Sequence, residues 1–442
     1  MSGLEIGLIS VWLFVFGATV GSFLNVCVYR LPKATGLWNG LRSLSSPPST
    51  CPKCRTRIRS RDNVPILGWL LLGGRCRTCG LKIAVRYPFV ELMNGLLWVG
   101  LYWLHRGSSP WPAIERSWLA TPYGPEAGEH PFFSPWWWIH ARFAYHVLLA
   151  ELLVVAGLID FDTKTIPKLV TDPFILVGVV LAGLGGLYLL PVAIHPPGFV
   201  EDARLLTAAL TSRELPSGLA ALFPDDLRPQ WIDGFPGSQL HGLAVSFAGV
   251  VAGVVPLLFL RVTGRWIYGR EAMGSGDVYL MALIGAFLGW QAALATIVLA
   301  ALIATASFVL ILLFGARAEV PFGPYLALGA ATVVGGWPWL WPRVEAVAGF
   351  GPLLLPLLVA LAMAFVVVAY ATRLLLHPLL CRLPGYREQW EAEPPGEWTA
   401  ADQNLFFANS RIDEERGLAE RPDWFGPSVS SGFQGEQSWR DD

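Results

Sequence analysis

The chain has 442 residues, of which 54% are hydrophobic and only 15% are charged, and its formal net charge at pH 7 is -1. Soluble domains contain about a quarter charged residues, so this composition excludes an ordinary soluble protein and indicates a membrane protein. The net charge alone excludes no class of partner, so the distribution of charge along the chain has to supply the topology.

The first apolar run extends from about residue 6 to residue 29 and contains Gly17, Gly21 and Ser22. It is long enough to cross a bilayer, and its small residues allow a second helix to pack closely. It has neither the basic start nor the A-x-A-like site of a cleavable signal peptide. Residues 1–30 are therefore predicted to form the first transmembrane span.

Residues 31–86 are predicted to form a cytoplasmic loop domain. From Arg30 to Arg86 twelve residues are basic and one, Asp62, is acidic. The positive-inside rule places such a loop in the cytoplasm and the N-terminus outside. A nucleic-acid-binding patch would also be basic, but the flanking spans argue against it, and no nucleic-acid partner is expected.

This loop contains two C-x2-C pairs, Cys51 with Cys54 and Cys76 with Cys79, separated by 21 residues. Such pairs are typical of a tetrahedral zinc site with four thiolate ligands. A reducing cytoplasm disfavours disulfides, and the absence of histidine from the set favours a structural site over a catalytic one. Residues 66–73, between the pairs, are apolar but too short to span a membrane.

The rest of the chain is predicted to be a transmembrane helix bundle over residues 87–378, followed by a polar and disordered cytoplasmic tail over 379–442. Its long loops at 106–137 and 194–238 are expected on the outside, as is a shorter tryptophan-rich loop at 337–349. The expected spans lie at about 87–104, 138–159, 169–192, a run ending near 260, 278–290, 292–314, a run opening near 320, and 350–375. The fold class is thus an all-α polytopic bundle of about eight or nine spans.

Three carboxylates stand at the cytoplasmic edge of this bundle. Asp160 and Asp162 end the third span, and Asp277 opens the sixth directly after Gly274 and Gly276. A charge near membrane depth costs roughly 2.5–3.5 kcal/mol, so such residues are functional candidates. Two carboxylates that share one proton could activate a water molecule. Either Asp160 or Asp162 could pair with Asp277.

Six motifs in order give the chain a resemblance to the type IV prepilin peptidases from about residue 10 to residue 335. They are residues 21–26 (GSFLNV), the paired C-x2-C loop, 86–88 (RYP) with Glu91, Asp160, 274–277 (GSGD) and 321–325 (PFGPY). The resemblance implies a multi-pass aspartic protease of the bacterial inner membrane, surrounded by lipid, with its active site facing the cytoplasm. Members cut the basic leader from prepilins and pseudopilins, and many also methylate the new N-terminus with S-adenosylmethionine.

The resemblance implies site residues as well. Counting back from Ile166 and Pro167, Asp160 occupies the position of the first catalytic carboxylate and Asp277 that of the second, with Asp162 as the alternative to Asp160. The residues implied to shape the site are Gly274, Gly276, Pro321, Gly323 and Glu91.

Two positions depart from the family pattern. The residue after Pro167 is usually Asp or Asn but is Lys168 here, and a Lys is usual two residues after the G-x-G-D motif where this chain has Tyr279.

Two other classes of function compete with the peptidase. A transporter would explain acids in a membrane, and a zinc-stabilised scaffold would explain the cysteines but not the carboxylates. Two roles of the zinc loop are compatible with the sequence: it serves methyl transfer, or it only braces the peptidase.

Overall fold

The protein is described by a computed structural model over residues 3–106 other than 35, 46, 47 and 52, and over 135–184, 187, 237–268, 273–313, 321–348 and 354–376. These residues are mostly helical and include no β-strand, apart from two isolated bridges in the cysteine loop. Of the expected polar regions, the loops at 106–137 and 194–238 lie almost wholly, and the tail at 379–442 entirely, outside the described residues.

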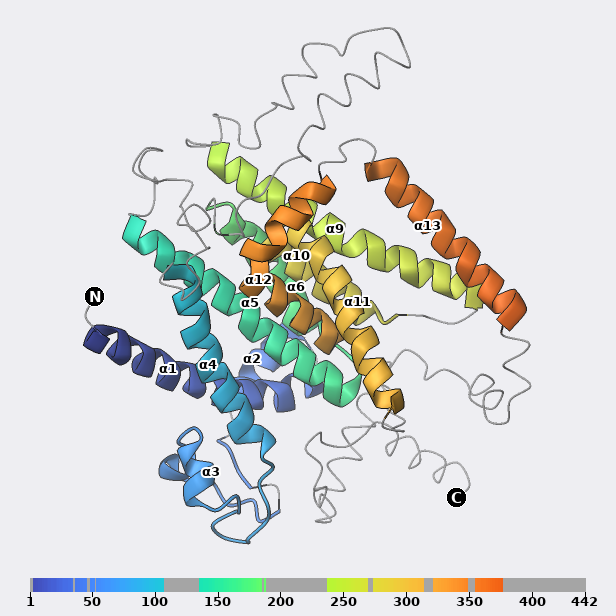
Figure 1. The fold of residues 1–442 in the computed structure, drawn as a ribbon. Helices are drawn as coiled ribbons and strands as arrows, with labels where there is room; N and C mark the ends of the chain where they lie inside the picture. The colour runs from blue at the N-terminus through green and yellow to red at the C-terminus, as the bar shows by residue number, and fades with distance from the viewer. Residues whose placement is uncertain are drawn as a thin grey trace, which may run out of the picture.

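The described chain forms helices that follow one another along the sequence, and Figure 1 labels them. They are α1 (Gly3–Arg30), η1 (Leu31–Lys33), α2 (Leu37–Ser45), η2 (Ser60–Asp62), α3 (Leu67–Leu71), α4 (Arg86–Arg106), α5 (Pro135–Thr163), α6 (Lys168–Ala182), α9 (Gly237–Tyr268), α10 (Ser275–Leu288), α11 (Trp290–Leu313), α12 (Gly323–Ala348), α13 (Leu354–Ala371) and η5 (Thr372–Leu376).

Four stretches of the described residues are long and apolar enough to cross a membrane: Leu4–Lys33, His140–Thr163, Gln239–Ile267 and Trp290–Ile311. Ser275–Leu288 and Ala362–Leu375 are shorter apolar helices. The described part of the chain is therefore an all-α membrane protein, as the composition predicts.

Two helix boundaries differ from the sequence prediction. The expected loop at 337–349 is helical as far as Ala348, because α12 continues through Pro338 and Pro342. Prolines are tolerated in membrane helices when neighbouring groups satisfy the exposed backbone. In the other case α6 ends at Ala182 rather than near residue 192, and Gly183 caps it with hydrogen bonds from its N–H to carbonyls of the last turn.

Helix α10 forms the centre of the larger group of helices. Figure 1 shows it among α6, α9, α11 and α12, and its closest packing is with α9 and α6. From Asp277 to Leu288 every residue except Tyr279 is buried. At the crossing with α9, Gly285 faces Gly249, and a side chain on either glycine would overlap the other helix's backbone. Paired glycines allow this close approach between membrane helices.

Helices α1 and α4 pack along each other, and both contact α5. A polar network crosses this interface: Asn94 Nδ2 donates to the Gly17 carbonyl at 2.8 Å and to Glu151 Oε1 at 3.0 Å. Trp98 Nε1 also donates to Glu151 Oε1, at 2.5 Å. These hydrogen bonds fix the register of α1, α4 and α5, so the start of α4 lies beside the end of α5.

Candidate functional site

Asp277 lies in the first turn of α10, where a negative side chain is favoured by the helix dipole. Its side chain is buried, and the backbone of Gly274 forms a hydrogen bond to the carboxylate. Gly276 lies directly against Ile166, since a Cβ added at Gly276 would stand 3.0 Å from the Ile166 Cβ and 3.2 Å from its backbone nitrogen. Glycine at 276 therefore allows the α5–α6 loop to close over the start of α10.

Asp160 lies near the end of α5 and is also buried. Its Oδ2 accepts a hydrogen bond of 3.0 Å from the backbone N–H of Gly323, the first residue of α12. A Cβ at Gly323 would overlap this carboxylate, so the contact needs glycine. Helix α10 packs against both α5 and α12, so the ends of these three helices bring Asp160 and Asp277 into one neighbourhood, close enough for their charges to interact.

Asp162 is engaged elsewhere. Its Oδ1 accepts a hydrogen bond of 2.6 Å from Arg86 Nη1, and these side chains are only 19% and 16% exposed. Arg86 is the first residue of α4, so this ion pair joins the end of the cysteine loop to the end of α5. The sequence analysis did not predict this ion pair. The available signal was an arginine at the start of one apolar helix, α4, and a second acidic residue near the end of another, α5.

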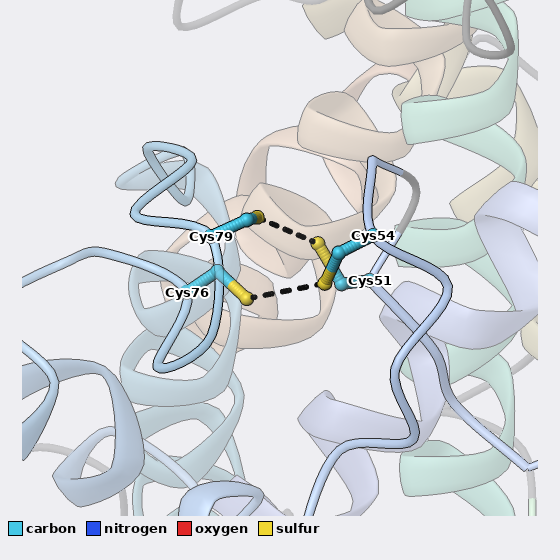
Figure 2. Close-up of side chains that lie close together, drawn as sticks. All are labelled: Cys51, Cys54, Cys76 and Cys79. Carbon is cyan, nitrogen blue, oxygen red and sulfur yellow. Dashed lines mark hydrogen bonds between the residues drawn. The ribbon is translucent and has the colours of Figure 1, made fainter.

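Four cysteine side chains point toward one another from two turns of the loop (Figure 2). The Sγ atoms of Cys51 and Cys79 are 3.7 Å apart, those of Cys54 and Cys76 are 3.9 Å apart, and all four lie within 4.8 Å of one another. A tetrahedral zinc ion with Zn–S bonds of about 2.3 Å places its sulfurs about 3.8 Å apart. The cluster could therefore bind a metal ion of this kind.

The two cysteine turns share a backbone design. In each, the residue after the second cysteine has a positive φ, 52° at Arg55 and 73° at Gly80. Its N–H donates back to the carbonyl of the first cysteine, at 2.9 Å in both turns. The turn therefore aims two sulfurs in the same direction, which is what a shared ion requires.

The thiols of the cluster differ in acidity. Hydrogen bonds from the side chain and backbone of Thr56 lower the pKa of Cys54 to about 6, whereas burial raises the pKa of Cys51 to about 12. Backbone hydrogen bonds, with that of Cys79 the strongest cause, also lower the pKa of Cys76. Binding of a divalent cation would favour the thiolate form of every member.

The middle of the segment between the cysteine pairs is held at two points, Asp62 and Ile66. Arg77 donates two hydrogen bonds to Asp62, of 2.9 and 2.6 Å, and these bonds lower the pKa of that carboxyl group. Glu91 Oε2 accepts the N–H of Ile66 at 2.6 Å, and Ile66 has a positive φ of 61°. The structure therefore places Glu91 at the base of the cysteine loop, and no contact with Asp160 or Asp277 is found for it among the described residues.

Pro321 and Gly323 lie where α12 begins, and Gly274 and Gly276 lie where α10 begins. Of these residues, Gly323 lies against Asp160 and Gly274 near Asp277, while Asp162 and Glu91 lie in the neighbouring contacts with α4. Two carboxylic groups held together at the ends of membrane helices can act as an acid–base pair.

Two family models match the chain. Residues 15–105 match a model described as the bacterial peptidase A24 N-terminal domain, and residues 202–310 match one described as the type IV leader peptidase family. The first range holds the cysteine loop, Arg86 and Glu91, and the second holds Asp277.

Curated relatives carry the same assignment. A prepilin leader peptidase/N-methyltransferase of Myxococcus xanthus is 29% identical over 311 residues, which is 70% of this chain and 65% of that protein. Enzymes of the same name from Dickeya chrysanthemi and Neisseria gonorrhoeae are 29% and 28% identical, over 74% and 73% of this chain and 95% and 87% of their own lengths. No solved structure was found to match the chain.

Proposed function

This chain belongs to the type IV prepilin peptidase family, and from that premise we propose that it is a membrane aspartic endopeptidase that removes the leader of prepilins and pseudopilins. The observation that carries the proposal is the approach of Asp160 to Asp277, with Gly323 donating its N–H to Asp160. Three separate stretches of sequence meet there, and the family model of the leader peptidases includes one of them.

In the proposed mechanism Asp160 and Asp277 act on one water molecule. One carboxylate is ionised and takes a proton from the water, while the other is protonated and polarises the scissile carbonyl. The resulting tetrahedral intermediate collapses when the leaving amine receives a proton from the pair. The substrate's apolar segment lies in the membrane beside the site, and its basic leader stays in the cytoplasm.

Asp160 is preferred over Asp162 because the two differ in their partners. Asp160 meets a backbone N–H beside Asp277, whereas Asp162 is held by Arg86 and its charge is already compensated. An acid–base residue needs an oxygen that can reach the water, and a carboxylate committed to a guanidinium offers less of this. Asp162 is proposed to hold α4 on α5.

We further propose that Cys51, Cys54, Cys76 and Cys79 bind one structural zinc ion. Four sulfurs at tetrahedral spacing leave no open coordination position, so the ion would brace the loop rather than take part in hydrolysis. We propose the domain organisation that the sequence predicts, with a first span over 1–30, a cytoplasmic zinc loop over 31–86, a peptidase bundle of eight or nine spans over 87–378 and a tail over 379–442. The N-terminus lies outside, in the bacterial inner membrane.

Methylation of the new N-terminus is the second proposed activity, because the relatives are N-methyltransferases as well. S-adenosylmethionine supplies an electrophilic methyl group when bound. The N-terminal half has buried acceptor atoms that suit a cationic group: Asn94 Oδ1 and Glu151 Oε2 have no hydrogen-bond partner among the described residues. These residues would hold the cofactor's cation or accept a hydrogen bond from the neutral amine that takes the methyl group.

One assay tests both activities. The purified protein is incubated in detergent with a prepilin peptide, and leader release is expected from the wild type and not from Asp277→Asn. Proton flux without cleavage would indicate a transporter, and neither activity would indicate a scaffold. The Asp277→Asn variant is then given a pre-cut peptide that begins with Phe and labelled S-adenosylmethionine. Label in the peptide supports methyl transfer, and its absence from wild type and variant alike leaves a peptidase alone.

A further inference from the structure

Lys168 and Tyr279 are in contact at the edge of the proposed active site. Lys168 is the first residue of α6, and its Nζ lies 4.9 Å from the centre of the Tyr279 ring. An ammonium group within about 6 Å of an aromatic ring centre is attracted to the ring face. Tyr279 is the residue of α10 that stays partly exposed while its neighbours from Asp277 to Leu288 are buried.

This contact joins the two turns that carry the proposed catalytic groups. Tyr279 follows Asp277 by two residues, and Lys168 follows Ile166, whose backbone and side chain lie against Gly276. The loop before Lys168 leads back to Asp160, and the N–H of Lys164 donates to the Asp160 carbonyl at 2.8 Å. The Lys168–Tyr279 contact therefore closes the same seam as the Ile166–Gly276 contact, between the starts of α6 and α10.

The ring of Tyr279 gives the charge of the exposed Lys168 a partner within the protein. A cation in the first turn of a helix is opposed by the helix dipole, and both α6 and α10 begin at this seam. The aromatic ring offers the ammonium group an electrostatic partner that is not an ion. Without the ring, the α5–α6 loop would lose this contact with α10.

Lys168 and Tyr279 are also the two positions at which the sequence departs from the family pattern, which has an acid or amide at the first and a lysine at the second. The two positions are 111 residues apart in the sequence. In the structure they touch each other.

We infer that Lys168 and Tyr279 are a positioning pair, which holds the α5–α6 loop on the start of α10 and so sets the spacing of Asp160 and Asp277. The inference rests on the proposed peptidase function for its catalytic consequence, though not for the contact itself. Neither side chain acts on the substrate's bond.

A double-mutant cycle tests the pair. Lys168→Met and Tyr279→Leu are made singly and together, and each variant is measured for kcat, KM and thermal unfolding in detergent. Each single change is expected to lower kcat by about two- to fivefold, the range of an exposed cation–π contact, with little change in KM. The double variant should be no slower than the slower single one, because the contact can be lost only once.

Conservative and exchanged variants sharpen the test. Lys168→Arg and Tyr279→Phe keep the charge and the ring, so both should retain wild-type kcat. Tyr279→Lys alone sets two cations against each other and should be the slowest variant, while Tyr279→Lys combined with Lys168→Asp should recover toward wild type. A purely local loss of folding would not be rescued by this exchange.

Two results would overturn the inference: additive losses in the cycle for both kcat and unfolding, or an exchanged pair no faster than Tyr279→Lys alone. If the wild type cleaves no prepilin peptide, the proposed function fails instead. The unfolding cycle still decides in that case whether the two side chains are coupled, so the two failures are distinguishable.

Discussion

The cysteine loop and helix α10 are stabilised in opposite ways. The loop is largely exposed, and its turns need positive φ angles at Arg55, Ile66 and Gly80. It is held by directed contacts, namely the four sulfurs, the Asp62–Arg77 ion pair and the Glu91–Ile66 hydrogen bond. Helix α10 is apolar and buried among other helices, and it is held by close packing against them.

This difference teaches where each region is vulnerable. A region held by a few ligands fails when one ligand is removed but tolerates changes between them, whereas a close-packed helix tolerates loss of a contact better than added volume. The loop meets the helices that carry the proposed site through Arg86 and Glu91 of α4. A mutation that disrupts the cysteine loop should therefore alter the positions of Asp160 and Asp277 indirectly, through α4.

The largest effect is expected from the carboxylates themselves. Asp160→Asn and Asp277→Asn should each lower the rate of leader cleavage by about 10²–10⁴-fold, because general acid–base catalysis is lost. Both changes preserve shape, so the thermal midpoint should hold in detergent. Asp162→Asn is the matched control two residues from Asp160, and a loss there as large as in Asp160→Asn would reverse the assignment.

The second largest effect is expected when one of the four sulfur ligands is removed. Cys76→Ser is expected to abolish binding of the proposed zinc ion and to open the loop to protease between the cysteine pairs, since structural zinc contributes folding energy. The bundle should keep its helical circular dichroism, and cleavage activity should fall but persist. Metal analysis and limited proteolysis measure this, with Cys381→Ser as control. A wild type without metal would contradict the proposed site.

Added volume in α10 should have a smaller effect on stability. Gly285→Ala places a methyl group against the backbone of Gly249 and should destabilise the bundle by about 1–3 kcal/mol. Gly335→Ala in α12 is the control, because a Cβ there meets nothing within 4 Å. Thermal unfolding of both variants in one detergent is the measurement. Equal midpoints would show that α9 and α10 can separate at no cost.

The smallest effect is expected where the two regions meet. Arg86→Met should lower stability by about 1 kcal/mol and cleavage activity modestly, because a partly exposed ion pair lies between the surface and buried extremes. The exchanged variant, Arg86→Asp with Asp162→Arg, should recover part of both losses. Comparison of the three proteins by unfolding and by kcat checks the pair, and an exchange that worsens both would show that orientation matters more than charge.

The sequence predicts features that depend on local spacing. The C-x2-C pairs predict four sulfurs in one cluster because each turn fixes two of them, and the structure brings them together. The apolar runs predict the helices and place Asp160 and Asp277 at the same edge. The long range of α12 was missed because prolines and tryptophans at 337–342 are typical of a loop as well as of a membrane helix end.

Contacts that depend on helix rotation could not be predicted. Asp160 and Asp162 are two residues apart on α5, and which of them faces α12 and which faces Arg86 depends on how α5 packs. The partner of Glu91 is a backbone N–H in a turn that nothing in the sequence marks, because isoleucine rarely adopts a positive φ. Lys168 and Tyr279 looked like separate departures for the same reason.

The burial of α10 also determines which substitutions the protein can tolerate along its sequence. Over residues 297–311, the second half of α11, only Ala300 is buried within the protein, so one apolar residue can replace another there with little consequence. In α10 almost every position touches another helix, and even a methyl group has to be accommodated. Random mutation should therefore accumulate in the second half of α11 long before it is accepted in α10. Libraries intended to alter the enzyme without losing it are best directed to residues 297–311 and kept out of α10.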